Sequence, residues 1–315
     1  MPRSRDRPVW PATAGARIAL VADCADWHTR ELTRAFAALG ARVVLVTLPS
    51  CAMETGRSSG LAISGFADGL PDAVVVRSMS GGTFEAVTLR LGILHALREL
   101  GVMVWNDART IERCVDKSMT SFLLARAGIP TPATWVTEQH AAAQAIVQRE
   151  LAQGPLVLKP LFGSQGRGLK LIRMAEDLPN PTAVAGVYYL QRYVAVERDG
   201  FRDFRLLVSQ RRVVAAMVRH AATWITNVKQ GGRPVAAVPD AEMKALAVRA
   251  VAAVGAEFAG VDMLYGADGC PTVLEVNSMP AWSGLQKVSP VRIASVIAGD
   301  VIAALADSRR RGAAV

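Results

Sequence analysis

The sequence predicts a mixed α/β protein in which a small parallel α/β lobe precedes two α+β subdomains. Near the start, apolar strand-like segments alternate with helical ones, which is typical of parallel α/β lobes. Farther along, a glycine-rich loop joins two strand-like segments, and no helix follows it directly. Near the end, two apolar strands that carry acidic residues are joined by a tight turn. We therefore expect an N-terminal domain at 1–105, a central subdomain at 106–190 and a C-terminal subdomain at 191–315.

The N-terminal lobe is expected to contain two strand–helix–strand repeats. Apolar runs indicate strands, and stripes of apolar residues that end in glycine indicate helices. The expected elements are a strand at 16–23, a helix at 28–40, strands at 41–48 and 72–78, a helix at about 84–100 and a strand at 102–106. The first strand reads into VADCAD rather than GxGxxG, so a dinucleotide-binding fingerprint is not supported. Residues 50–68 are rich in Ser, Gly and Ala and predict a loop.

Composition narrows the class of protein. The net charge of +9 would suit nucleic acid, but the basic residues are spread along the chain and aromatic residues make up only 6% of it. A small anionic substrate such as a nucleoside triphosphate explains the charge at least as well, so no DNA partner is expected. No apolar run approaches the roughly 20 residues of a membrane span, and no signal peptide is evident. A cytoplasmic location without a membrane partner is expected, and four scattered cysteines argue against zinc or disulfides.

The most informative segment is VLKPLFGSQGRGLKLI. Lys159 lies in a short apolar strand, where an ammonium group is costly unless it reaches a partner. The loop after Pro160 contains Gly163, Gly166 and Gly168, whose backbone N–H groups can approach phosphate oxygens. A lysine with a glycine flap suits a triphosphate. An ordinary glycine-rich hairpin with a lysine reaching to solvent explains this segment equally well.

Three oxygen donors lie near the C-terminal turn. Asp262 and Glu275 occupy strands joined by that turn, and Asn277 lies two residues after Glu275, on the same face of its strand. Hard oxygen ligands at this spacing suit one or two Mg2+ ions that bridge phosphates. Because the acids interrupt apolar strands, a metal site is favoured over a solvated face.

Two further segments are less specific. The strand ending in QRYV could offer a backbone carbonyl and N–H group to an adenine edge. Asp203 and Arg205, followed by Arg219 and His220, fall on two strands that could form one hairpin. Exposed cross-strand pairing of Asp with Arg accounts for these four residues about as well as a functional cluster does.

Taken together and in this order, the segments resemble the ATP-grasp superfamily, and most closely its RimK-like glutamate ligase branch. The resemblance covers about residues 102–304, and several independent motifs carry it. The matching stretches are WNDARTIERCVDKSMTSFLLARAGIPTPAT, VLKPLFGSQGRGLKLI, LQRYV, DFRLLV, VVAAMVRH, TNVKQGG, AGVDMLY and VLEVNSMPAWSGLQKVSPVRIA.

The resemblance implies a role for each matching residue. Lys117 and Lys159 would contact the phosphates of ATP, beneath a flap whose members are Gly163, Ser164, Gln165, Gly166 and Gly168. The base and ribose would lie against Gln191, Arg192, Tyr193, Val194 and Asp203, with Glu197 as an alternative ribose contact. Lys159, Arg219 and Asn227 would act at the reacting groups, Arg205, Arg219 and His220 at the substrate, and Asp262, Glu275 and Asn277 would hold Mg2+, with Mn2+ as an alternative.

The resemblance also implies the reaction. An ATP γ-phosphoryl group would pass to a carboxylate, and an amine, by the habit of this branch L-glutamate, would displace phosphate from the acyl phosphate. The acceptor is open between a pterin or deazaflavin coenzyme, an amino-carrier protein and a protein C-terminus. A non-catalytic nucleotide-binding protein and a basic, nucleic-acid-associated module are the alternatives in other classes. Enzymes of this branch are often dimers or tetramers, so a homo-oligomer is one expectation.

The chain departs from the family pattern at two places. Ile225 stands where an arginine is often found two residues before the loop asparagine, and Ala281 follows Pro280 where Pro-Gly is common. Trp224 and Trp282 flank these departures and could line a pocket for a flat ring, although packing in the core or a place on the surface is the more ordinary role of tryptophan.

Overall fold

The computed structural model describes residues 15–67, 69–163, 165–194, 200–266 and 269–312. The chain forms two compact units. Unit 1 comprises Met1–Ala108, Ala281–Ser283 and Val291–Val315, and unit 2 comprises Arg109–Pro280 and Gly284–Pro290. Among the described residues, no helix combines the length and apolar character needed to cross a bilayer.

Unit 1 is built on a parallel sheet with the strand order β2-β1-β5-β6. Its strands are almost purely apolar, and the middle ones are buried, as expected for a parallel sheet covered on both faces. The strands are β1 (Arg17–Val21), β2 (Arg42–Val46), β5 (Ala73–Val76) and β6 (Met103–Trp105). The predicted parallel α/β lobe is thereby confirmed.

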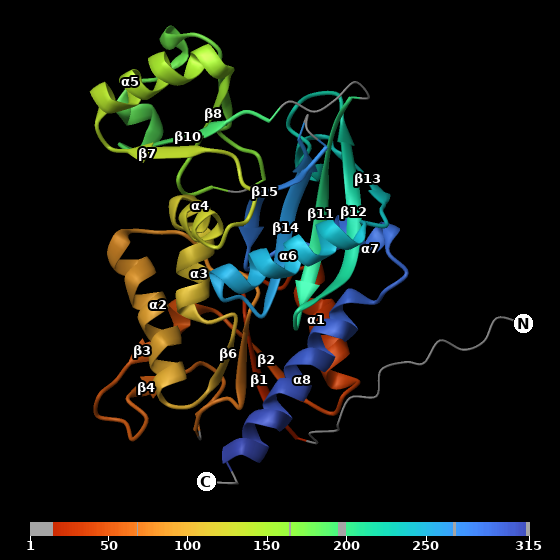
Figure 1. The fold of residues 1–315 in the computed structure, drawn as a ribbon. Helices are drawn as coiled ribbons and strands as arrows, with labels where there is room; N and C mark the ends of the chain where they lie inside the picture. Colours follow the sequence, from red (N-terminus) through yellow and green to blue (C-terminus); the bar gives the residue numbers. More distant parts are fainter. Residues whose placement is uncertain (1–14, 68, 164, 195–199, 267–268, 313–315) are drawn as a thin grey trace, which may run out of the picture. The chain divides into compact units, whose positions relative to one another are not determined.

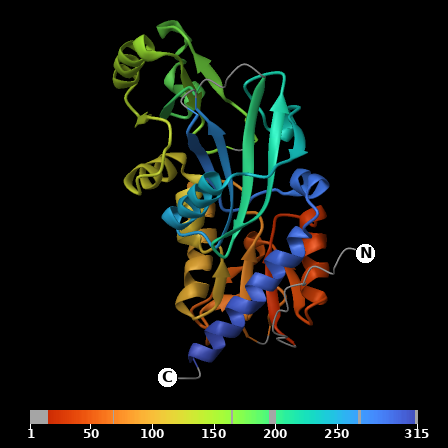
Figure 2. The same cartoon turned by 45° about the vertical axis from the view of Figure 1, so that its right-hand side comes forward.

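Three helices cover this sheet. They are α1 (Trp27–Ala37), α2 (Phe84–Glu99) and α8 (Ile293–Gly312). α1 packs beside α8 on one face and α2 lies on the other face (Figures 1 and 2), because right-handed crossovers from β1 to β2 and from β5 to β6 leave the sheet on opposite sides. The C-terminal helix therefore belongs to unit 1, whereas the sequence placed it in a domain at 191–315. The three-domain division remains a prediction.

Residues 50–67, which the sequence predicts to be part of a loop, contain regular secondary structure. After the short helix η1 (Leu48–Ser50), strands β3 (Ala52–Met53) and β4 (Leu61–Ala62) pair as an antiparallel hairpin. Leu61, Ile63 and Phe66 are buried. Strands of two residues are too short to give an alternating pattern, which explains why the sequence predicted only a loop.

Unit 2 begins at Arg109, the second residue of helix α3 (Ala108–Val115). Helix α4 (Lys117–Arg126) and a four-stranded antiparallel sheet follow. The sheet has the order β7-β10-β8-β9, with β7 (Thr134–Thr137), β8 (Leu156–Lys159), β9 (Lys170–Ile172) and β10 (Tyr188–Arg192). Helix α5 (His140–Glu150) and the short helices η2 (Leu151–Gln153), η3 (Ala175–Asp177) and η4 (Pro181–Val184) complete this part. β8 and β9 are antiparallel neighbours, so the glycine-rich loop joins adjacent strands as predicted.

The second sheet of unit 2 has five antiparallel strands in the order β13-β12-β11-β14-β15. They are β11 (Phe201–Ser209), β12 (Arg212–Ala221), β13 (Arg233–Ala236), β14 (Phe258–Tyr265) and β15 (Pro271–Asn277). Helix α6 (Ala241–Val254) packs across this sheet (Figure 1), and its buried residues share one apolar core with β11, β14 and β15. The remaining elements are η5 (Val228–Gln230) and α7 (Ser283–Val288).

Candidate active site

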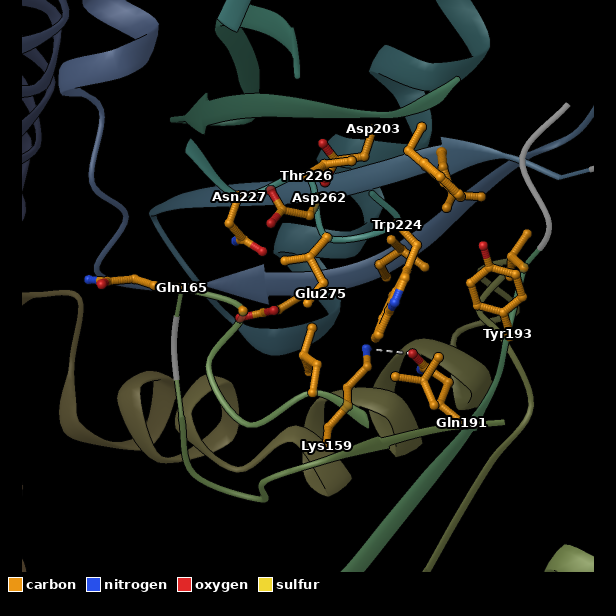
Figure 3. Close-up of a pocket in the computed structure, with 18 of the residues that line it drawn as sticks. Lys159, Gln165, Gln191, Tyr193, Asp203, Trp224, Thr226, Asn227, Asp262 and Glu275 are labelled. Atoms are coloured by element: carbon orange, nitrogen blue, oxygen red, sulfur yellow. Dashed lines mark hydrogen bonds between the residues drawn. The ribbon is translucent and has the colours of Figure 1, made fainter. Parts of the chain in front are cut away.

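One cavity of about 130 Å³ in unit 2 collects most of the residues that the sequence singled out. Strands of both antiparallel sheets line it, together with the glycine-rich loop and the loop after β12. Figure 3 shows Lys159 entering from one side and Asp262, Glu275 and Asn227 from the opposite side. The lining residues of predicted function are Lys117, Lys159, Gly163, Gln165, Gly166, Gln191, Arg192, Tyr193, Val194, Asp203, Arg219, Asn227, Asp262 and Glu275.

Two lysines form the basic side of the cavity. Lys159 ends β8, and its Nζ donates to Oε1 of Gln191 at 2.6 Å. Lys117 starts α4, and its Nζ donates to the carbonyl oxygens of Gly163, at 2.7 Å, and Leu161, at 3.3 Å. Burial lowers the pKa of both amines, and that of Lys159 reaches about 8, because Glu275 and Asp262 offset only part of the loss of hydration.

The phosphate contact that the sequence predicts for Lys159, together with its pKa, leads to an expected pH dependence. Phosphate favours the protonated amine, so the affinity of the protein for ATP should be flat below pH 8 and fall above it, approaching tenfold per pH unit. Calorimetric titration with ATP between pH 6.5 and 9.5 measures this profile. Lys159→Arg is the matched control, since a guanidinium keeps its charge throughout and should flatten the profile. A native profile that stays level up to pH 9.5 would contradict the assignment of Lys159 to phosphate.

Asp262 and Glu275 form the acidic side. They are direct partners across β14 and β15, so both side chains lie on the same face of the sheet. Asp262 accepts two hydrogen bonds of 2.6 Å from Arg205 and lies 3.0 Å from Nη2 of Arg219. Burial alone would raise the pKa of Asp262, but these two guanidinium groups outweigh it and hold the pKa well below its usual range. Asp262 is therefore a carboxylate at neutral pH.

The hairpin that the sequence predicts for Asp203, Arg205, Arg219 and His220 is present in the structure. Asp203 and Arg219 are partners across β11 and β12, and Arg219 Nε donates to Asp203 at 2.7 Å. Both side chains are buried, so the exposed pairing considered from the sequence is not what the structure shows. Arg219 thus bridges two carboxylates at the cavity wall, Asp203 and Asp262. Arg205 and His220 are not among the lining residues.

The acidic side has the donor chemistry of a magnesium site. Two carboxylates from adjacent strands face a cavity that also presents two lysines, and Mg2+ commonly takes one or two carboxylates together with water and substrate phosphates. Asn277 lies at the end of β15, where its Oδ1 accepts from Met279 N at 2.9 Å, and it is outside the lining. Asp262 and Glu275 therefore fit the ion, and Asn277 would have to join them from the end of the strand.

The glycine-rich loop packs against the loop after β12. Gly166 and Gly168 both have φ near +72°, a conformation that favours glycine. A Cβ atom on Gly166 would lie 2.6 Å from Oδ1 of Asn227 and 2.8 Å from Cγ2 of Ile225, so the backbone of the loop touches the loop after β12. Gln165 lines the cavity, although its side chain points away from the other labelled residues in Figure 3. Ser164 lies outside the described residues.

The end of β10, where the sequence predicts a contact with the base, borders the cavity. Tyr193 and Val194 line the cavity, and the Tyr193 ring meets Trp224 edge-on with 6.2 Å between ring centroids. The guanidinium of Arg192 is engaged elsewhere, since it donates to Glu150 Oε2 at 2.5 Å and to two nearby carbonyl oxygens. Glu197 lies outside the described residues.

The two tryptophans at the departures from the family pattern have different environments. Trp224 lines the cavity, in agreement with the prediction that it could line a pocket. Trp282 is 1% exposed and belongs to unit 1, where its backbone N–H donates to His28 Nε2 at 3.2 Å. Packing in the core, the more ordinary role, therefore applies to Trp282 alone.

Sequence reasoning missed several lining residues. Arg167 in the glycine-rich loop and Arg202 on β11 add two exposed cations to the cavity wall. Thr226 is buried next to Asn227 in the loop after β12. The arginine in QGRG could have been noticed, because it lies between two of the glycines, whereas nothing in the local pattern marks Arg202 or Thr226.

Comparison with known proteins identifies the family of this site. A profile described as the RimK-like ATP-grasp domain matches residues 114–302. The chain belongs to the RimK-like ATP-grasp family. Enzymes of this family are ADP-forming carboxylate–amine ligases, and the chain is accordingly a ligase of this kind. The resemblance and the fold inferred from the sequence are confirmed.

Named relatives of this RimK-like ligase cover most of its length. It is 36% identical over 241 residues to the tetrahydromethanopterin:alpha-L-glutamate ligase of Methanocaldococcus jannaschii, an overlap of 73% of this chain and 79% of the relative. It is 31% identical over 289 residues to the probable alpha-L-glutamate ligase of Sodalis glossinidius, which covers 90% and 95% of the two chains.

Solved structures share the fold. The RimK domain ATP-grasp protein from Sphaerobacter thermophilus superimposes with a TM-score of 0.66 at 26% identity, over 91% of this chain and 100% of the other. The ATP-grasp ligase PsnB, in complex with a minimal precursor, Mg and ADP, gives a TM-score of 0.69 at 23% identity over 92% and 98%. At that identity the second likeness concerns the fold alone.

Proposed function

We propose that this ligase joins the amino group of L-glutamate, or of another amino acid, to the carboxylate of a small molecule through an acyl phosphate. The observation that carries the proposal is that Lys117 and Lys159 line the same cavity as Asp262 and Glu275. Cationic and oxygen-donor groups around one cavity are what the transfer of a phosphoryl group requires. The named glutamate ligases among the relatives support the choice of amine, and the tetrahydromethanopterin ligase supports a pterin-type acceptor.

In the first step, a carboxylate oxygen of the acceptor attacks the γ-phosphorus of ATP while the bond from that phosphorus to the β–γ bridging oxygen breaks. Lys117 and Lys159 neutralise the phosphate oxygens, and Lys159 is held at the cavity by Gln191. In the second step, the amino group attacks the acyl carbon, the bond from that carbon to the phosphate oxygen breaks, and the departing phosphate takes the proton that the nitrogen loses. Positioning and charge neutralisation account for both steps, so no protein nucleophile is needed.

Asp262, Glu275 and Asn277 would hold Mg2+, which supplies further neutralisation of phosphate charge when bound. Arg219 is fixed between Asp203 and Asp262 and lines the cavity, where it would bind the reacting phosphoryl or acyl group. Asn227 stands at the tip of the facing loop, where its amide can bind a phosphoryl or acyl oxygen. The roles of Arg205 and His220 at the substrate remain predictions, and Arg205 is placed to orient Asp262.

The glycine-rich loop gates this chemistry. The cavity volume of about 130 Å³ is below the roughly 300–1,000 Å³ of small-molecule sites, and in this proposal the loop moves away from Ile225 and Asn227 to admit ATP. Gly166 and Gly168 give the backbone of the loop the conformational freedom to move back against Ile225 and Asn227. Return of the loop excludes water, which would otherwise hydrolyse the acyl phosphate. Tyr193, Val194 and Trp224 would receive the adenine at the other end of the cavity.

A two-way screen tests the proposal. ADP release is measured with each amino acid crossed with a panel of carboxylated small molecules, including pterin and deazaflavin coenzymes, and with peptides as a separate arm. We expect ADP release that needs both partners, and a product whose mass equals the sum of the two substrates minus water. ADP release only with peptides would overturn the small-molecule acceptor. Tight ATP binding without ADP release in any mixture would overturn the proposed ligation reaction as a whole.

A further inference from the structure

A second cavity, of about 490 Å³, lies entirely within unit 1. The first residues of β1 and β2 form one side of it, and the segment from Ser50 to Ala67 forms the other. Gly65 holds that segment against β2, because a Cβ atom there would lie only 2.5 Å from Cγ1 of Val44. The volume falls within the range of small-molecule sites, and the proposed ligase chemistry makes no use of this cavity.

The wall of this cavity is strongly basic. Arg17, Arg42 and Arg57 line it, and none of its described lining residues is an Asp or Glu. Arg17 and Arg42 are direct partners in the parallel pairing of β1 with β2, so their side chains lie on the same face of the sheet. Like charges placed side by side on neighbouring strands are destabilising. The fold thus carries an electrostatic cost at this edge of the sheet.

The described part of the chain relieves this cost only in part. Arg57 pairs with Glu54 beside the cavity. Arg17 donates from Nη2 to the carbonyl oxygen of Leu70 at 2.6 Å, and its guanidinium lies 5.8 Å from the centre of the Phe66 ring, so its position is fixed. Arg42 is exposed and has no ion-pair partner among the residues that the structure describes. One oriented and two accessible guanidinium groups therefore face the same space.

We propose that this cavity is a second ligand site of the protein, which binds a small molecule carrying two or more phosphate or carboxylate charges. Guanidinium groups bind both anions through paired N–H donors, and two adjacent arginines favour a polyanion over a monoanion. Phe66 and Ile63, both buried, give the site an apolar floor. Binding there would remove the repulsion between Arg17 and Arg42, so the ligand also stabilises unit 1.

Calorimetric titration in metal-free buffer with pyrophosphate and with citrate tests the site. The variant Arg42→Gln with Arg57→Gln should weaken binding of the preferred anion by at least about tenfold, since two of the three charges are lost. With the nucleotide cavity occupied by saturating ADP, Lys159→Gln should leave that binding unchanged, because Lys159 belongs to the nucleotide cavity. Tighter binding of pyrophosphate indicates a phosphate-bearing ligand, and tighter binding of citrate indicates a polycarboxylate. Absence of binding by both anions, or equal binding by the native protein and the double variant, would overturn the proposal.

The charge-matched control is Arg30→Gln with Arg34→Gln, which removes two exposed cations from α1 of the same unit. This control should bind the anion with the native affinity. A loss of affinity as large as that of the variant with Arg42→Gln and Arg57→Gln would mean that the net charge of the protein, and not the cavity, determines anion binding. Thermal unfolding adds an independent measurement. Arg42→Gln alone should raise the midpoint of the free protein, because the repulsion with Arg17 is removed, and should abolish the rise caused by the anion. Retention of that rise in Arg42→Gln would also overturn the site. The variants of Arg42 and Arg57 should bind ADP with the native affinity. This result would show that the second site can be tested independently of the proposed ligase reaction.

Discussion

Glu275→Gln is expected to reduce ATP-dependent ligation by at least about a hundredfold while the protein remains folded. Glutamine keeps the shape of the side chain but removes one of the two carboxylates that face Lys117 and Lys159 across the cavity. Unlike Asp262, Glu275 has no ion-pair partner in the described part of the chain, so the substitution breaks no salt bridge, and it removes only the longer-range attraction of Glu275 for Lys117 and Lys159. ADP release under saturating ATP and Mg2+ measures the loss, and thermal unfolding checks the fold.

The control is Glu242→Gln, at an exposed position in the first turn of α6. It changes the same group outside the cavity and should leave the turnover within about twofold of the native rate. The magnesium assignment fails if Glu275→Gln turns over ATP as fast as this control does.

Asp262→Ala should unfold the protein more readily as well as inactivate it, at a cost of about 3–5 kcal/mol in the free energy of unfolding. Asp262 is 6% exposed and is bound by Arg205 through two hydrogen bonds and by Arg219. Its removal leaves Arg205 without its carboxylate and Arg219 with Asp203 alone, and both guanidinium side chains are largely buried. Denaturant unfolding followed by circular dichroism gives the free energy.

Asp307→Ala provides the comparison for Asp262→Ala. Asp307 pairs with Arg310 one turn away on α8, where both side chains are more than half exposed, so its loss should cost less than about 1 kcal/mol. Equal destabilisation by the two substitutions would show that the buried network around Asp262 contributes no more than a surface pair.

The sequence could predict those parts of the site that depend on local pattern. Lys159 could be placed because a charged residue ends an apolar strand before a glycine-rich loop. Asp262 and Glu275 could be placed on one face because a short turn joins their strands. Asp203 and Arg219 could be paired for the same reason, since β11 and β12 form a hairpin. The assignment of metal, base and substrate roles to these residues is still a proposal.

The remainder depends on contacts between distant segments, which periodicity does not encode. The bond between Arg205 and Asp262 exists because β11 pairs with β14, 57 residues away along the chain. That pairing is why the two acids, which look equivalent in the sequence, differ in their expected effect on stability. Trp282 could not be separated from Trp224 either, because only the fold assigns its neighbourhood to unit 1. The cytoplasmic location and the homo-oligomer remain predictions.

The assembly of unit 1 from three stretches of chain has a consequence for how the protein is made. Because α8 packs on α1, the N-terminal sheet acquires its last covering helix only after residues 291–312 have been synthesised. Unit 2 can form its own core earlier, at a stage when helix α8 of unit 1 has not yet been synthesised. A fragment that stops at residue 108 would expose the apolar face of α1, so the amino-terminal lobe is not a module that can be excised or exchanged by itself.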